Sequence, residues 1–341
     1  MSARDALDAL VVGGGRFGTA LATVLARLDR RVEVWVRRGE QSVEINGRHC
    51  NARYLPDFDL PKNLVATTDL ASGVRRARIV LMAVPSQSFR EVARSVGDYI
   101  AGDQLLVHAT KGFEVASFKR MSQILWEETC SLKIGALSGP SLAHDMMAGY
   151  PAGALLASRY DEVVVKTQEL FENGPFRVYA GRDVVGTEVA GAFRNVVALA
   201  TGISDGLGLG DSAKSLLVTR GLNEMARLGV AMGGHVLTFG GLAGVGDLLS
   251  ACCSSKSLNY QVGKRLASGE PLEAVLDSMA GVAEAVPTAE AVHRHATATG
   301  LDLPIVKAVH SLVCEGCSIK QAVTELLSTP VGWELAALRE G

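Results

Sequence analysis

The chain has 341 residues, of which 48% are apolar and 21% charged, and this composition is typical of a globular protein with about two domains. Its 34 Lys and Arg residues nearly balance its 36 Asp and Glu residues, so the positive field that would hold nucleic acid or an anionic membrane is missing. No apolar run reaches the ~18 residues of a membrane span, and glycines interrupt the first apolar segment, so no span or signal peptide is expected. We expect a cytoplasmic protein.

The cysteines and histidines show no metal-binding pattern. Six cysteines are too few for a disulfide scaffold. Cys314 and Cys317 form one Cys-x-x-Cys pattern, but they lack a second pair or a nearby histidine, and we interpret them as buried thiols. The seven histidines are scattered singly along the chain. We therefore predict no metal site.

Short β-branched runs alternate with amphipathic stretches in the first half of the chain. A helical pattern over residues 18–28 is one such stretch. The alternation predicts an α/β fold, a Rossmann-like doubly wound parallel sheet. The runs that predict its strands are 9–12, 32–36, 79–84, 105–109 and 134–137.

The second half has few strand signals. Apolar residues recur there at spacings of three and four, which predicts helices. The predicted helices are 189–201, 213–228, 272–276, 286–297, 305–313 and 319–327. The pattern changes near 182–187, so we predict a dinucleotide-binding domain, 1–186, and an all-α substrate and catalytic domain, 187–341.

A glycine-rich turn follows the first predicted strand. Residues 13–18 read Gly-Gly-Gly-Arg-Phe-Gly and open a predicted helix, which is the context expected of a dinucleotide-binding turn. Gly13 would make the tight turn, Gly15 would admit a pyrophosphate, and Gly18 would let the helix pack closely. We predict that these glycines, with Arg16 and Phe17, bind the cofactor. A structural turn without a ligand is the alternative.

The end of the second predicted strand bears on the choice of cofactor. An acidic residue usually binds the ribose diol there, but Glu33 lies inside the strand and the strand ends in Arg37 and Arg38. Two guanidinium groups favour a 2′-phosphate, so we expect NADP to be used as well as NAD. Two solvated surface arginines are the alternative interpretation.

Motifs over about residues 8–328 resemble the NAD(P)-dependent glycerol-3-phosphate dehydrogenases. They include Arg-Tyr-Leu-Pro at 53–56, Ala-Val-Pro-Ser-Gln at 83–87, Thr-Lys-Gly-Phe-Glu at 110–114, Ser-Gly-Pro-Ser at 138–141, Glu-Val-Ala-Gly-Ala-Phe-Arg-Asn at 188–195 and Gly-Val-Gly-Asp at 244–247. The resemblance implies a Rossmann-like domain followed by a helical domain, and a homodimer. It also implies hydride transfer between NAD or NADP and C2 of glycerol 3-phosphate or dihydroxyacetone phosphate, a step of glycerophospholipid metabolism.

The resemblance also implies the catalytic residues. Lys111 matches the family's first active-site lysine, and Asn195 and Asp247 match residues beside the reacting oxygen. The aspartate would orient a cationic partner. Arg194 occupies the position of the family's catalytic lysine and would polarise the carbonyl.

The remaining matches concern the cofactor and the substrate. Val84 and Pro85 would form the rest of the cofactor-binding surface, and Glu284 matches a helical-domain residue that reaches the cofactor. Ser141 and Asn259 are the expected substrate-binding residues, and Asn259 matches the residue after the family's phosphate-binding arginine.

Three positions depart from the family pattern. Arg194 replaces a lysine, Ala251 a threonine and Leu258 the phosphate-binding arginine, while Lys256 lies close enough in sequence to compensate in part. A protonated arginine cannot act as a base, and loss of the two polar groups predicts roughly 30- to 2000-fold weaker phosphate recognition. Three interpretations stay open: compensation within the family reaction, a paralogue with a different small hydroxy or keto substrate, and a catalytically silent dinucleotide-binding protein.

Overall fold

The computed structural model describes residues 6–328, which belong to two compact units. The first unit contains Met1–Thr110 and Met121–Val184, and the second contains Lys111–Arg120 and Val185–Gly341. A ten-residue segment in the middle of the first unit's sequence therefore packs with the helical unit, which sequence order alone does not reveal. The two units are described separately below.

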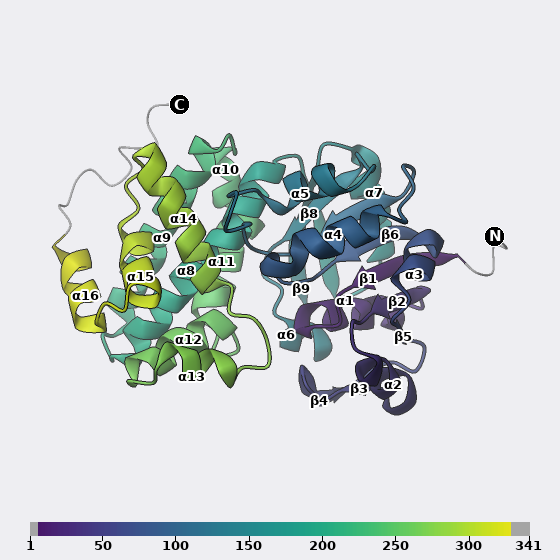
Figure 1. The fold of residues 1–341 in the computed structure, drawn as a ribbon, viewed down its shortest axis with the longest axis horizontal. Helices are drawn as coiled ribbons and strands as arrows, with labels where there is room; N and C mark the ends of the chain where they lie inside the picture. Colours follow the sequence, from purple (N-terminus) through teal and green to yellow (C-terminus); the bar gives the residue numbers. More distant parts are fainter. Residues whose placement is uncertain (1–5, 329–341) are drawn as a thin grey trace. The chain divides into compact units, whose positions relative to one another are not determined.

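The first unit is built on an eight-stranded sheet (Figure 1) with the order β10-β9-β8-β7-β6-β1-β2-β5. Neighbouring strands are parallel except for β8 and β9, which are antiparallel. The strands are β1 (Leu7–Val12), β2 (Val32–Trp35), β5 (Val65–Thr67), β6 (Ala77–Met82), β7 (Leu105–His108), β8 (Ile134–Ser138), β9 (Ala152–Ser158) and β10 (Phe176–Gly181). A separate hairpin joins β3 (Cys50–Asn51) and β4 (Leu55–Asp59).

Helices cover both faces of this sheet. Alternate residues of β1 point to opposite sides, so Ala9 and Val11 belong to one apolar cluster while Leu10 and Val12 belong to another. The first cluster draws on α1 (Arg16–Arg27), α2 (Gly39–Arg48), α6 (Ala143–Met147) and α7 (Asp161–Leu170). The second draws on α3 (Leu70–Arg76), α4 (Phe89–Gly97) and α5 (Met121–Glu128). The fold class predicted from the sequence is thus confirmed, except that the sheet is not wholly parallel.

The second unit is helical over its described residues from 185 to 328. Its helices are α8 (Val184–Gly206), α9 (Asp211–Ala231), α10 (Val236–Phe239), α11 (Asp247–Cys252), α12 (Leu258–Ala267), α13 (Leu272–Asp277), α14 (Ala285–Thr299), α15 (Pro304–Cys314) and α16 (Ile319–Leu327). A π-helical turn, Leu242–Gly246, leads directly into α11. On α9 the buried Glu224 accepts hydrogen bonds from the backbone N–H groups of Ile305 and Val306, and so caps the start of α15.

The longest helix, α8, extends further than the sequence suggests. The predicted helix ends at residue 201, but α8 continues to Gly206 and the connection to α9 is confined to 207–210. A Cβ atom at Gly202 would collide with the carbonyl oxygen of Tyr260 on α12. This glycine therefore serves close helix packing and not chain reversal.

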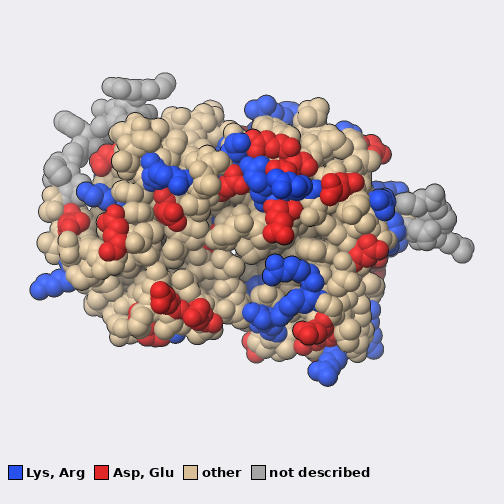
Figure 2. Space-filling view, in the orientation of Figure 1, with Lys and Arg blue, Asp and Glu red and all other residues tan. Residues whose placement is uncertain are grey.

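The surface charges agree with the balanced composition. On the face drawn in Figure 2, Lys and Arg side chains are interspersed with Asp and Glu. Within residues 6–328, no helix has both the length and the apolar character needed to cross a membrane.

Candidate active site

The glycine turn between β1 and α1 has the geometry expected of a dinucleotide-binding turn. Gly13 has a φ of +120°, and a Cβ there would lie 2.6 Å from the carbonyl oxygen of Ala83, while a Cβ at Gly18 would collide with the carbonyl of Gly13. A Cβ at Gly15, by contrast, would meet no atom within 4 Å. The protein's own packing thus explains Gly13 and Gly18, and also Gly14, where a Cβ would collide with the side chain of Val36. Gly15, in contrast, borders open space where a pyrophosphate would lie.

This turn lies where the strand order reverses. Successive strands run outward from β1 in opposite directions, through β2 on one side and β6 on the other. Ligands of open α/β sheets bind beyond the carboxyl ends of the strands at such a point. In the loop that follows β6, Val84 is buried and Pro85 is exposed.

The other predicted cofactor residues occupy varied environments. Arg16 donates from Nε to the carbonyl of Tyr54 at 3.2 Å, and Phe17 packs partly buried against the core. Arg37 is exposed after β2, and Arg38 is the N-cap residue of α2.

Glu33 forms an ion pair within the first unit. Its Oε2 atom is 2.6 Å from the guanidinium of Arg76 on α3. The acidic residue that the sequence placed too early for a ribose diol therefore has a partner within the first unit.

In the second unit, two cations share one buried carboxylate. Lys111 Nζ lies 2.5 Å from Oδ2 of Asp247, and Arg194 Nε lies 3.2 Å from the same oxygen. Asp247 is almost fully buried at the start of α11, and Arg194 comes from the middle of α8. The carboxylate thereby holds the two positive groups close together.

The environment of Lys111 makes its ammonium group unusually acidic. Its side chain is 11% exposed, and burial disfavours the charged form. Burial and the positive charge of Arg194 lower the pKa of Lys111 to about 8, against the opposing effect of Asp247. A lysine with a pKa near neutrality can both give and take a proton at physiological pH.

A chain of amide hydrogen bonds holds the backbone beside this lysine. Asn195 Nδ2 donates to the carbonyl of Lys111 at 3.0 Å, and Asn259 Nδ2 donates to Asn195 Oδ1 at 2.8 Å. The backbone N–H of Ala285 in turn donates to Asn259 Oδ1 at 3.0 Å. These bonds connect the segment Lys111–Arg120, α8, α12 and α14, and Glu284 is the N-cap residue of α14. The two asparagines therefore hold the backbone at Lys111 in place relative to these helices.

A second anchor holds the other end of the segment Lys111–Arg120. Arg120 forms a buried ion pair with Glu188 on α8. Glu188 precedes Asn195 by two helical turns, so both contact residues lie on one side of α8. Glu188 belongs to a recognisable motif, but Arg120 could not be predicted as its partner, because no local pattern links residues 68 positions apart.

The departures from the family pattern leave an apolar environment next to Asn259. Ala251 is fully buried on α11, and Leu258, the first residue of α12, has a Cδ1 atom only 2.9 Å from where a Cβ on Gly281 would lie. Lys256 is exposed in the preceding loop.

Ser141 belongs to the first unit. Its hydroxyl donates to the carbonyl of Gly139 at 3.0 Å. It lies between β8 and α6, outside the cluster around Asp247 that the second unit forms.

The structure corrects one prediction about the cysteines. Cys314 is exposed and Cys317 is half-buried, because α15 ends at Cys314 and the following turn leaves the packed part of the helix. The fold also brings His293 and His310 together, although they are far apart in the sequence.

A doubly wound sheet with a glycine turn at its point of reversal, followed by a helical unit with a buried Lys-Asp-Arg cluster, defines a two-unit NAD(P)-dependent dehydrogenase. Family models described as the N- and C-terminal parts of NAD-dependent glycerol-3-phosphate dehydrogenase match residues 9–164 and 183–324. The chain belongs to the NAD-dependent glycerol-3-phosphate dehydrogenase family. It is an oxidoreductase that acts on a CH–OH group with NAD or NADP.

Individual relatives support this assignment over nearly the whole chain. The glycerol-3-phosphate dehydrogenase [NAD(P)+] of Bacillus thuringiensis strain Al Hakam is 42% identical over 331 residues, covering 96% of this chain and 97% of the relative. A crystal structure of glycerol-3-phosphate dehydrogenase from Coxiella burnetii has a TM-score of 0.91 and 34% identity, covering 95% of this chain and 99% of that one. The yeast enzyme from Saccharomyces cerevisiae has a TM-score of 0.79 and 28% identity, with coverages of 94% and 99%.

Proposed function

We propose that the protein catalyses hydride transfer between NAD(P)H and dihydroxyacetone phosphate to give glycerol 3-phosphate, and the reverse reaction. The observation that carries this proposal is the buried Lys111, whose ammonium group lies against Asp247 and has a pKa of about 8. Reduction of a ketone at neutral pH needs such a proton donor beside the reacting oxygen.

Each charged residue of the cluster has a distinct role in this reaction. The nicotinamide, when bound, supplies or accepts the hydride. Lys111 donates its proton to the oxygen that becomes the alcohol and recovers it in the reverse direction. Arg194 stays protonated and stabilises negative charge on that oxygen, and Asp247 holds both cations in place.

The phosphate of the substrate would be bound by the second unit through Asn259 and Lys256. The apolar Leu258 between them is the observation that favours the second candidate, a related small hydroxy or keto compound without a phosphate at this point. A lysine is a flexible point charge and does not reproduce a planar arginine fork, so we expect a raised KM for glycerol 3-phosphate.

The experiment is a nicotinamide absorbance assay of the purified chain with dihydroxyacetone phosphate, in parallel with unphosphorylated dihydroxyacetone. Turnover that needs the phosphate, and that Lys111→Ala abolishes, supports the proposal. Lys166→Ala is the matched control, because Lys166 is also paired with a carboxylate, Glu169, but is 54% exposed. Turnover of the unphosphorylated compound alone would favour the second candidate, and no turnover with intact NAD(P)H binding would indicate a silent binder.

The choice of cofactor rests on the arginines after β2. If they bind a 2′-phosphate, the double variant Arg37→Ala, Arg38→Ala should weaken NADPH binding selectively and in a salt-dependent way. An equal loss for NADH would show that the pair acts only as surface charge.

We also propose a homodimer, a cytoplasmic location and a division of function between two domains. A homodimer is tested by light scattering of the eluted protein, and a cytoplasmic location by fractionation of the source cells. The functional division into a dinucleotide-binding domain, 1–186, and a substrate domain, 187–341, is tested in the full chain, where Gly15→Ala should weaken cofactor binding and Leu258→Arg should change the KM for the substrate.

A further inference from the structure

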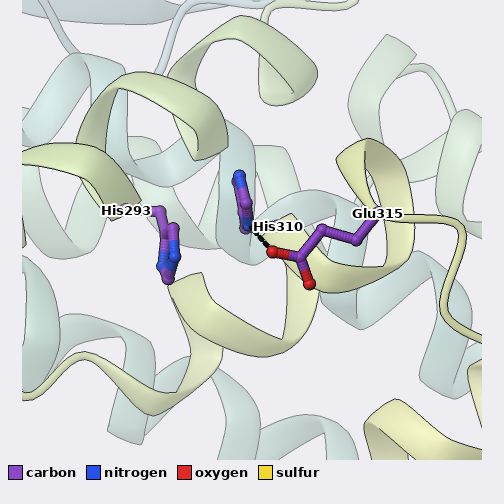
Figure 3. A group of neighbouring side chains, drawn as sticks. All are labelled: His293, His310 and Glu315. Atoms are coloured by element: carbon purple, nitrogen blue, oxygen red, sulfur yellow. Dashed lines mark ion pairs between the residues drawn. The ribbon is translucent and has the colours of Figure 1, made fainter. Parts of the chain in front are cut away.

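A group of three side chains with metal-binding atoms lies in the second unit, apart from the Lys111 cluster. His293 is on α14, His310 is on α15, and Glu315 is the C-cap residue of α15. One ligand atom from each lies within 4.8 Å of the others. Figure 3 shows the two imidazole rings side by side, with the Glu315 carboxylate directed at His310.

The His310 ring has a nitrogen whose environment is unusual for a protein interior. Its Nδ1 atom is buried and has no hydrogen-bond partner, although Glu315 Oε1 lies 3.4 Å away. Buried polar atoms are nearly always satisfied, and an exception calls for a bound water or ion. This observation is independent of the clustering and leaves Nδ1, which faces the Glu315 carboxylate, able to bind an ion.

We propose that His293, His310 and Glu315 bind one divalent transition-metal ion of the Zn²⁺ class. Two imidazoles and one carboxylate form a donor set suited to Zn²⁺, Co²⁺ or Ni²⁺, and water would complete a four-coordinate ion. Mg²⁺ and Ca²⁺ are not the preferred ions for this site, because they select oxygen donors and two of the three donors are nitrogens.

The distances define what must move when the ion binds. Bonds of about 2.0–2.2 Å to a tetrahedral ion place ligand atoms roughly 3.3–3.6 Å apart, and the gap of 3.4 Å between His310 and Glu315 already matches this spacing. The rings of His293 and His310 are stacked, with centroids 4.0 Å apart and an interplanar angle of 18°. Each imidazole lone pair lies in its ring plane, and two nearly parallel planes cannot both contain the ion, so His293 must turn out of the stack for its nitrogen to reach it.

The surrounding charges keep a donor available at neutral pH. Burial, then the facing His310 and Lys307, lower the pKa of His293, and Glu315 opposes them. A neutral imidazole is the form that binds a metal, so protons compete with the ion and binding should weaken at acid pH. The bound ion would cross-link α14 to the end of α15.

The test is calorimetric titration of the untagged, metal-stripped full chain with Zn²⁺, together with the absorption spectrum of the Co²⁺ form. We expect one ion per chain, and an affinity at least ~10-fold lower in His310→Ala and in Glu315→Gln. His144→Ala is the matched control, because its Nδ1 also faces a carboxylate, Asp145, at 3.5 Å, yet it belongs to no such group of three ligands in the described chain. This control should bind Zn²⁺ like the unaltered protein.

Neighbouring thiols provide a second discriminating variant. Cys314 and Cys317 lie beside the site in sequence, and replacing both with Ser should leave Zn²⁺ binding intact. Loss of Zn²⁺ binding in the Cys variant with retention in His310→Ala would overturn the proposal. It would also be overturned if the unaltered protein bound no stoichiometric Zn²⁺ at millimolar concentration. Because the readout is metal binding, failure here leaves the proposed dehydrogenase activity untouched.

Discussion

Replacing Arg194 by methionine should shift the pH dependence of catalysis, because Arg194 helps to keep Lys111 acidic. Lys111 Nζ and Arg194 Nε lie 2.5 and 3.2 Å from the same oxygen of Asp247, so the two nitrogens are at most roughly 5.7 Å apart. At about 6 Å and an effective dielectric constant of about 20, two unit charges repel by roughly 3 kcal/mol, or about two pKa units.

The sign of the shift follows from the direction of the reaction. Ketone reduction requires protonated Lys111, so kcat/KM should be constant at low pH and fall as the pH rises through about 8. In Arg194→Met the ammonium loses its repelling neighbour and keeps Asp247, so the fall should begin near pH 10, about two units higher.

The assay is the pH profile of kcat/KM for dihydroxyacetone phosphate reduction, and Arg194→Lys is the matched control. The lysine keeps the positive charge, so the alkaline limb should stay close to that of the unaltered enzyme. Where Arg194→Met is too slow to assay, NMR titration of isotope-labelled Lys111 measures the same quantity. An unchanged pKa of Lys111 in Arg194→Met would refute the electrostatic argument.

Three further outcomes are expected. Gly15→Ala should weaken NAD(P)H binding with little loss of stability, whereas Gly18→Ala should destabilise the fold, as cofactor titration and urea unfolding will show. Burial raises the pKa of Glu224 to about 8, so the protonated side chain stabilises the fold fully below about pH 4.5, and this stabilisation is lost as the pH rises through about 8. In Glu224→Gln, the urea midpoint of unfolding should therefore fall less steeply over this pH range. Leu258→Arg should lower the KM for glycerol 3-phosphate about tenfold or more, and an unchanged KM would mean that another group binds the phosphate.

The sequence identifies the parts of the fold whose local pattern is strong. The five predicted strands and six predicted helices all occur, with ends shifted by a few residues. The strand β9 was missed because Ala152–Ser158 has no β-branched residue, and β10 because half of Phe176–Gly181 is polar or small and much of it is exposed. The antiparallel pairing of β8 with β9 is a tertiary choice that no local pattern encodes.

For the site as well, residues in local motifs could be predicted from the sequence, whereas contacts made by tertiary packing could not. Motifs with fixed spacing identified Lys111, Asn195 and Asp247, and these residues do meet in the second unit. The hydrogen bond from Asn195 to a backbone carbonyl could not be predicted, since a backbone atom leaves no signature in the sequence. The pair His293 and His310 was missed for a related reason, because only the packing of α14 on α15 brings the rings together.

The assignment of Lys111–Arg120 to the helical unit has a consequence for synthesis and for dissection of the protein. The segment leaves the ribosome before Asn195, Asp247 and Glu188 exist, so its native contacts must wait until α8 and α11 have been made. A fragment that ends near residue 186 would carry the acidic lysine without the groups that position it. A fragment that begins there would contain a buried aspartate and glutamate deprived of two of their cations, and uncompensated buried charge is strongly destabilising. Neither half made alone is expected to reproduce the catalytic arrangement, although the change in sequence pattern near residue 186 suggests a domain boundary there.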